Sequence, residues 1–280
     1  AQAEQLLARA LVRAPDDAGL RRLAARAHLA QGQTMRALAQ LEPLTGAGTA
    51  DAEALALAAQ ARLLAGEVAP AAALFARAAE IRPDDGRLRA ATALLRLRDG
   101  DEAALGDLQQ AARLDQDTGA DLALVATLVQ RRAFGDALQA IDRMAAKQPD
   151  APLADLLRGQ VLLQQGRGEA ARAVFDRVLA RHPDDLPALA ALARLDLAAG
   201  RPADAEARYA ALLRRQPRLA AAHLALADLA LRSGAGRGVA AERLRAGIAA
   251  VPDDIGLHLA LIDLQMVGER PRAALEAAQV

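Results

Sequence analysis

The residues best suited to chemistry in this sequence are acidic pairs that follow proline. The motif Pro-Asp-Asp occurs at residues 15–17, 83–85, 183–185 and 252–254. Two adjacent carboxylates can serve as a general acid and base, or as ligands of a hard metal ion. Aspartate just before a helix, however, accepts hydrogen bonds from the free N–H groups of the first turn, and every helix needs such a cap. Because the motif recurs at the boundaries of a repeat, the sequence favours helix capping over catalysis.

Two of the four histidines, His223 and His258, are a second candidate pair because they occupy equivalent places 35 residues apart. A metal site or catalytic pair also needs a third ligand or a carboxylate that orients the imidazole. Asp228 and Asp263 each follow a histidine by five residues, which is a poor helical spacing for that role. We therefore predict a structural role for these histidines and no metal site.

A glycine-rich segment, residues 234–238, precedes a predicted helix and suggests a phosphate-binding loop. It lacks the spacing of phosphate-binding motifs and has no strand before it, so we interpret it as a lengthened turn between helices. Ser233 is the only serine and has no histidine–aspartate pair near it in sequence, which argues against a serine nucleophile. No cofactor and no catalytic residue are therefore expected.

Composition excludes further classes of function. The chain has 280 residues, and its 35 basic and 35 acidic side chains give zero formal charge, which argues against binding of nucleic acid or anionic lipid. The absence of cysteine excludes disulfides and zinc–thiolate sites. No uncharged apolar run approaches the roughly 20 residues that span a bilayer, and any targeting signal is expected outside this segment.

The elements that position these residues form an internal repeat of about 34 residues. A larger apolar side chain follows each alanine of the repeat by four residues, except at Ala278. A helix stop follows twelve residues after the first eight alanines, and six of these eight stops are proline, with Thr49 and Gln116 as the exceptions. The alanines are Ala3, Ala37, Ala71, Ala104, Ala137, Ala171, Ala205, Ala240 and Ala274.

Each period contains two stretches of helical apolar spacing, roughly 12–15 residues long. The alanine marks the closest approach of two helices, and the larger residue one turn later fills the layer between repeats. Proline ends the second helix because it cannot continue the hydrogen-bond ladder. A turn with positive φ joins the two helices, and the glycines expected there are Gly32, Gly66, Gly100, Gly166, Gly200 and Gly234.

This pattern of alanine, a larger apolar residue and proline resembles the tetratricopeptide repeat (TPR) family over the whole chain. The resemblance implies an all-α superhelical solenoid of antiparallel helix pairs, in a single array over residues 1–280. Since neither end carries a polar capping helix, we expect a segment of a longer array. The expected repeats are a partial one at 1–17, full ones at 18–51, 52–84, 85–117, 118–151, 152–185, 186–219 and 220–254, and a truncated one at 255–280.

TPR proteins bind partners on the concave face that their first helices line, so the resemblance implies a non-enzymatic scaffold with a protein or peptide in the groove. The chain has no asparagine and a single lysine, Lys147, so it does not resemble the members that clamp a C-terminal carboxylate. By position in the repeat, the side chains expected to face outward there are Arg22, Arg26, Gln60, Arg96, Gln130, Gln160, Gln164, Arg194, Asp228, Arg232 and Asp263.

Four stretches carry a closer resemblance, namely AAKQPDAP at 145–152, LARLDLAAGRP at 192–202, LALADLAL at 224–231 and LHLALIDLQ at 257–265. Together they resemble the TPR lipoprotein of the bacterial PEP-CTERM/exosortase system. That resemblance implies a role in exopolysaccharide export or protein sorting at the cell envelope, in the periplasm or at the outer membrane. Two alternatives stay open: the regulatory or substrate-recruiting arm of a larger enzyme such as a glycosyltransferase, and an assembly adaptor in the cytoplasm.

Overall fold

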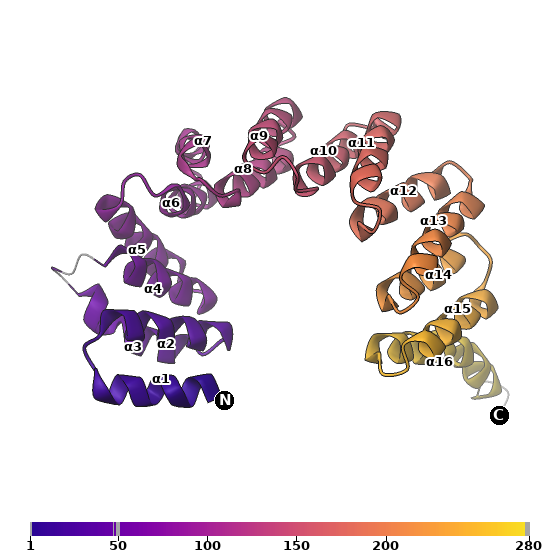
Figure 1. Ribbon diagram of the computed structural model, residues 1–280, viewed down its shortest axis with the longest axis horizontal. Helices are drawn as coiled ribbons and strands as arrows, with labels where there is room; N and C mark the ends of the chain where they lie inside the picture. Colours follow the sequence, from indigo (N-terminus) through magenta and orange to yellow (C-terminus); the bar gives the residue numbers. More distant parts are fainter. Residues whose placement is uncertain (1, 47, 49–50, 278–280) are drawn as a thin grey trace. The chain divides into compact units, whose positions relative to one another are not determined.

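The computed structural model describes residues 2–46, 48 and 51–277, and all regular structure in these ranges is α-helical (Figure 1). Consecutive helices are joined by short turns and pack on one another in pairs. The all-α class and the helix-pair architecture are thereby confirmed. The helices divide between two compact units, residues 1–149 (unit 1) and residues 150–280 (unit 2). The single array over residues 1–280 stays a prediction.

Even-numbered helices are the first helices of their repeats, and odd-numbered helices are the second helices. Unit 1 contains α1 (Gln2–Arg13), α2 (Ala18–Ala30), α3 (Thr34–Thr45), α4 (Ala52–Leu64), α5 (Val68–Ile81), α6 (Gly86–Arg98), α7 (Ala104–Leu114), α8 (Gly119–Gln130) and α9 (Phe134–Lys147). Unit 2 contains α10 (Leu153–Gln164), α11 (Gly168–Arg181), α12 (Leu186–Ala198), α13 (Pro202–Arg215), α14 (Ala220–Arg232), α15 (Arg237–Ala250) and α16 (Ile255–Ala277).

The repeated alanines lie where the sequence places them, in the contacts between helices. Those of α3, α5, α7, α9, α11, α13 and α15 are all completely buried. The larger residue four positions later is buried in each of these helices as well, from Leu41 in α3 to Leu244 in α15. The side chains of Ala3 and Ala274, and residues Thr49 and Ala278, lie outside the described residues. A small residue every 34 positions therefore sets the approach of the helices in both units.

This packing makes a larger side chain at an alanine position costly. We expect Ala171→Leu to lower the free energy of unfolding by about 1–3 kcal/mol, because the completely buried site between helices has no room for it. Asp185→Ala, which removes one helix cap, is expected to cost about 1 kcal/mol. Urea denaturation of the two variants beside the parent measures the difference, and equal losses would contradict the packing argument.

The second aspartate of each Pro-Asp-Asp motif caps the helix that follows it. The carboxylate of Asp17 accepts from the backbone N–H of Leu20 at 2.9 Å, and that of Asp185 accepts from Ala188 at 2.8 Å. The corresponding aspartates at positions 85 and 254 do the same for α6 and α16. The first aspartate is free for other contacts, and Asp184 accepts from Arg215 Nε at 2.9 Å. The capping interpretation is confirmed.

Turns and stops also follow the sequence pattern. Each of the six predicted turn glycines has a positive φ, between 70° and 91°. In unit 2 the second helices end two residues before their prolines, as α11 does at Arg181 before Pro183. The exception among the turns is the one between α8 and α9, where Arg132 takes the equivalent position with φ 58°. A side chain with a Cβ is strained in this left-handed conformation.

Replacing this arginine by glycine should stabilise unit 1. We expect Arg132→Gly to raise the free energy of unfolding by about 0.5–1 kcal/mol, since relief of the left-handed strain exceeds the entropy that glycine adds to the unfolded chain. The reverse change, Gly166→Arg at the equivalent turn with φ 72°, should destabilise unit 2 by about 1 kcal/mol. Thermal unfolding of both variants tests the pair, and shifts of the same sign would refute it.

The end of unit 2 differs from the predicted truncated repeat at 255–280. The pattern predicts a first helix, a turn and part of a second helix, whereas α16 is continuous from Ile255 to Ala277. A glycine at the expected turn, Gly268, costs a helix only about 1 kcal/mol relative to alanine. Pro271 also lies inside α16, where proline removes one backbone hydrogen bond, and the contacts recorded for α16 are with α14 and α15. Within the described residues, no helix is both long enough and apolar enough to cross a bilayer.

Candidate functional site

The histidines have a structural role, as predicted. His223 Nε2 lies 2.9 Å from the carbonyl oxygen of Pro217, and His258 Nε2 lies 2.7 Å from that of Pro252. Arg21 makes the same contact to an earlier proline carbonyl, at 2.7 Å. These side chains therefore satisfy the carbonyl left free at the end of a repeat. No cluster of three or more histidine, aspartate or glutamate side chains suited to a metal ion occurs in the described part of the chain.

The glycine-rich segment is a turn between helices. Gly234 and Gly236 have φ values of 80° and 93°, and α15 begins directly afterwards at Arg237. The hydroxyl of Ser233 donates to the carbonyl oxygen of Ala230 at 3.2 Å, within the same stretch of chain. The extra residue thus lengthens the connection between α14 and α15.

We call the face of the even-numbered helices that carries Arg26 and its equivalents the first-helix surface of each unit. Six predicted residues take one equivalent position on it, namely Arg26, Gln60, Gln160, Arg194, Asp228 and Asp263, and all six are exposed. Three more lie one turn further along their helices and are exposed as well, namely Gln130, Gln164 and Arg232. Arg22, one turn before Arg26, is half-buried. Ten of the eleven predicted residues therefore share the two surfaces.

Arg96 of α6 is the exception to this register along the helices. Its guanidinium pairs with Asp101 at 2.7 Å and with Asp107 of α7, a second helix. Those hydrogen bonds and charges raise the pKa of Arg96, with Asp101 the larger influence. The turn positions Gly100 and Arg132 are 32 residues apart instead of 34. Counting whole periods therefore shifts Arg96 by two residues, and two residues rotate a helix position by about 200°.

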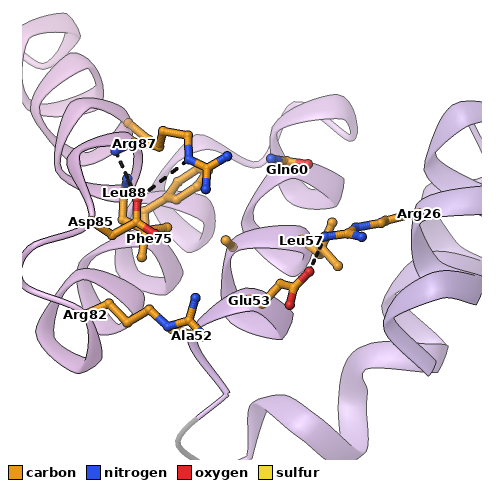
Figure 2. A pocket seen from close by; sticks show the side chains of 12 residues that line it. Arg26, Ala52, Glu53, Leu57, Gln60, Phe75, Arg82, Asp85, Arg87 and Leu88 are labelled. Carbon is orange, nitrogen blue, oxygen red and sulfur yellow. Dashed lines mark hydrogen bonds and ion pairs between the residues drawn. The ribbon is translucent and has the colours of Figure 1, made fainter. Parts of the chain in front are cut away.

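In unit 1 the first-helix surface contains a pocket of about 520 Å³ (Figure 2). Arg26 of α2 and Gln60 of α4 line it, as the sequence predicts for the groove. Its apolar side includes Leu57, Phe75 and Leu88, from α4, α5 and α6. A pocket with apolar walls and a few polar groups suits a ligand side chain better than it suits water.

Carboxylates neutralise the arginines on the α2 side of this pocket. Arg22 pairs with Asp51 at 2.5 Å and with Glu53 at 3.3 Å. Arg26 pairs with the same glutamate, as Figure 2 shows. These partners come from α4 and its N-terminal cap, so the pairs join two successive first helices. An arginine held in this way is positioned but partly neutralised.

The opposite side of the pocket carries arginines that sequence reasoning missed, Arg82 and Arg87. Arg82 follows α5, and Arg87 lies in the first turn of α6. Neither is an outward position of a first helix, so counting by repeat does not find them. Their place beside Pro83 and Asp85, at the junction between repeats, is the signal that could have identified them.

Unit 2 has a smaller pocket of about 260 Å³ in its own first-helix surface. Three predicted residues line it, Arg194 of α12 with Asp228 and Arg232 of α14. Arg232 Nε donates to Asp228 at 2.6 Å. Tyr209 of α13 lies against the pocket, and burial raises the pKa of its phenol. The predicted residues thus converge on a pocket in this unit too.

Unit 2 also contains an ion cluster around a buried aspartate, which the sequence did not indicate. Asp196 of α12 is only 1% exposed. It pairs with Arg172 of α11 at 2.7 Å, with Arg208 of α13 at 2.7 Å and with Arg201 at 3.3 Å. Burial opposes ionisation of Asp196, but hydrogen bonds from Arg208 and Arg172 outweigh it and lower the pKa of the carboxyl. This cluster joins three successive helices.

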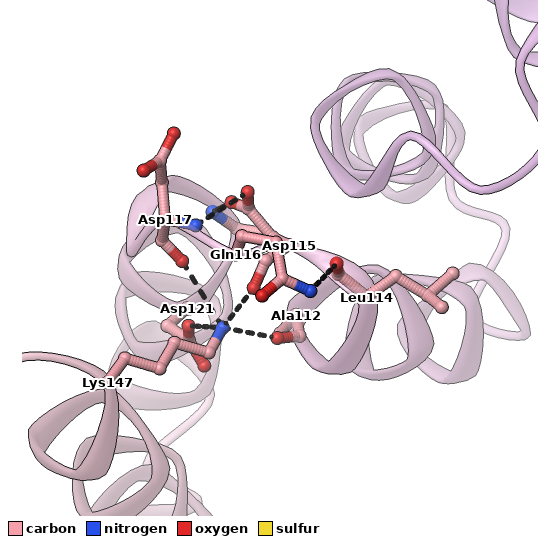
Figure 3. A network of polar contacts seen from close by, with 8 residues as sticks. Ala112, Leu114, Asp115, Gln116, Asp117, Asp121 and Lys147 are labelled. Carbon is pink, nitrogen blue, oxygen red and sulfur yellow. Dashed lines mark hydrogen bonds and ion pairs between the residues drawn. The ribbon is translucent and has the colours of Figure 1, made fainter.

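The single lysine is also a structural residue (Figure 3). Lys147 Nζ donates to the carbonyl oxygens of Ala112 at 2.7 Å and Asp115 at 2.6 Å, and to Asp121 Oδ2 at 2.5 Å. Asp121 is completely buried. The lysine therefore ties α9 to the end of α7 and to α8, at the boundary where Gln116 replaces proline. Because its ammonium is engaged inside unit 1, it does not form a carboxylate clamp.

Models of the tetratricopeptide repeat match residues 22–86, 122–185 and 162–229, which together make up more than half of the chain. No curated protein matches the chain. The fold is similar to that of the APC/C hetero-tetramer Cut9-Hcn1, with TM-score 0.52 and 18% identity over 93% of this chain and 51% of that one. The chain therefore spans about half the length of that relative.

Two further solved structures show the same fold. A tetratricopeptide repeat protein from Parabacteroides merdae has TM-score 0.52 and 18% identity, over 81% of this chain and 91% of that one. The human IFIT1 dimer with PPP-AAAA has TM-score 0.50 and 17% identity, over 86% of this chain and 62% of that one. At these identities the likeness concerns the fold alone.

Proposed function

Because the chain is a tetratricopeptide repeat protein, we propose that it is a non-catalytic scaffold that binds a protein or peptide on its first-helix surfaces. Proteins of this family generally mediate protein–protein interactions. The observation that carries the proposal is the convergence of predicted polar residues on a pocket in each unit, next to buried apolar side chains. An apolar centre with a polar rim is the usual anatomy of a protein interface.

A matched pair of fourfold alanine variants tests this proposal. The first replaces Arg26, Gln60, Gln160 and Arg194, two arginines and two glutamines of the first-helix surfaces. The control replaces two arginines and two glutamines that are exposed on second helices, namely Gln110, Arg113, Gln139 and Arg177. Both variants should melt close to the parent, because exposed substitutions usually change stability by less than about 0.5 kcal/mol.

The expected result is that the first variant loses partners that the parent and the control both retain in crosslinking and affinity capture from the source cells. A truncated arginine anchor alone can cost about 2 kcal/mol or more of binding free energy. If both variants capture the same partners as the parent, the first-helix surfaces are not the binding site.

The finer proposal is a role in exopolysaccharide export or PEP-CTERM protein sorting, in the periplasm or at the outer membrane. Its support is the four sequence stretches that resemble the TPR lipoprotein of that system. The encoding gene should then specify a lipidated cysteine upstream of this segment. A catalytic α/β domain encoded downstream would instead support the alternative in which the repeats form the arm of an enzyme such as a glycosyltransferase.

A further inference from the structure

One side of the unit 1 pocket has two guanidinium groups that are weakly paired or unpaired among the described residues. Within the described residues, no hydrogen bond or ion pair involves the Arg82 side chain. Arg87 is 70% exposed, and its one ion pair is a long contact of 3.9 Å to Asp85. That aspartate already accepts from the N–H groups that begin α6, at 3.1 and 3.3 Å. The positive charge of this side is therefore available to a ligand.

The arginine on the opposite side of the pocket, Arg26, has a close carboxylate partner. Arg26 is paired with Glu53, which also accepts from Arg22. In Figure 2 this pair lies across the pocket from Arg87, with Leu57 beside it. The pocket is thus neutralised on the α2 side, whereas on the α6 side the two arginines outnumber the one carboxylate, that of Asp85. An acidic ligand would be oriented by this difference, because like charges across an interface cost several kcal/mol.

Between the two sides the pocket is apolar and large enough for side chains. Leu57, Phe75 and Leu88 line it, each only 5–7% exposed. Its volume of about 520 Å³ lies within the 300–1,000 Å³ typical of binding pockets. Small alanines of α4 and α6 complete the lining, so a bound chain could approach the helix backbones. An apolar side chain next to a carboxylate fits this arrangement.

We propose that this pocket binds an acidic segment of the partner protein, with carboxylates of the segment on Arg82 and Arg87 and a neighbouring apolar side chain over Leu57 and Phe75. The inference rests on the proposed function and narrows the partner to one class of peptide. Guanidinium binds carboxylate through paired, charge-assisted hydrogen bonds, and it keeps its charge at every physiological pH. The carboxylates orient the bound segment, and the apolar side chain is buried against the pocket.

The test uses the full chain and fluorescein-labelled 12-residue peptides in which glutamate and leucine alternate. Matched peptides replace glutamate with lysine or leucine with serine. Fluorescence anisotropy should show binding of the glutamate–leucine peptide and at least about tenfold weaker binding of the other two. Raising the salt concentration should weaken the first interaction, since exposed charges are screened over about 8 Å at physiological ionic strength.

Charge reversal locates the site. Arg82→Glu/Arg87→Glu should weaken binding of the glutamate–leucine peptide by at least about tenfold. The control Arg13→Glu/Arg113→Glu makes the same change of charge on exposed second-helix positions and should leave affinity within about twofold. Circular dichroism confirms that both variants fold.

Equal binding of the lysine peptide, or equal loss in both double variants, would overturn the inference. Absence of peptide binding, together with partner capture that depends on the first-helix surfaces, would overturn it while leaving the proposed function in place. Peptide binding that survives reversal of Arg82 and Arg87 would place the acidic segment elsewhere and refute this site.

Discussion

Asp196→Ala is expected to lower the free energy of unfolding of unit 2 by about 1.5–3 kcal/mol, because it removes the charge-assisted hydrogen bonds that three arginines make to one buried carboxylate. The carboxylate is 1% exposed and pairs with Arg172, Arg201 and Arg208. Urea denaturation monitored by circular dichroism measures the loss, and hydrogen exchange assigns it to α11–α13. Asp176→Ala is the matched control, since Asp176 is half-exposed and contacts Arg208 at 3.6 Å. A loss no larger than that of the control would refute the role of the cluster.

The Asp196 cluster should also make the stability of unit 2 depend on pH, and Asp196→Ala should weaken that dependence. The pKa of Asp196 is lower in the folded chain than in the unfolded chain, because hydrogen bonds from Arg208 and Arg172 outweigh the opposing effect of burial. The stabilisation that ionised Asp196 provides is therefore complete above the pKa of about 3.9 in the unfolded chain. It is lost as the pH falls through the lower pKa of the folded chain. The parent should lose stability below about pH 4 more steeply than Asp196→Ala does.

Lys147→Met is expected to lower the free energy of unfolding of unit 1 by about 3–5 kcal/mol. The reason is that Asp121 would be left as a completely buried charge without its partner. The carbonyl oxygens of Ala112 and Asp115 would lose their donor at the same time. Hydrogen exchange is expected to show the loss in α7, α8 and α9, which the lysine joins.

A double-mutant cycle separates the ion pair from the other contacts of Lys147. Adding Asp121→Asn to Lys147→Met removes the uncompensated charge, so the double variant should be more stable than the sum of the single losses predicts. Interaction energies of contacting residues are commonly 0.5–3 kcal/mol in such cycles. If the loss of unfolding free energy in the double variant equals the sum of the two single losses, the interaction between Lys147 and Asp121 does not contribute to stability.

The sequence predicts the repeating parts of this structure because their causes are local or periodic. Alanine at one position and a positive φ at another recur in every complete period, and an aspartate cap recurs before α2, α4, α6 and α12. This pattern is visible without knowledge of the fold. Ala171, Gly166 and Asp185 are examples, and each lies as predicted. Ten of the eleven predicted surface residues follow from the same counting.

Counting fails where the period changes or where the cause is tertiary. Arg96 departs from the register because the neighbouring period is short, so a shift of two residues turns the side chain toward α7. Lys147 and Asp121 are 26 residues apart, and Arg172 and Asp196 are 24 apart, so no local pattern links the members of either pair. Arg82 and Arg87 meet the pocket from a junction between repeats. Such contacts become visible only once the helices are packed.

Lys147 is the only lysine of the chain, and its amine is held by three backbone carbonyls and a carboxylate. A protonated amine engaged in this way is a poor nucleophile toward acylating reagents. We therefore expect an activated ester to modify this side chain slowly until α9 separates from the end of α7. The rate of acylation at a single atom then reports how often this part of unit 1 opens, so one lysine-specific mass measurement can follow local unfolding without any introduced label.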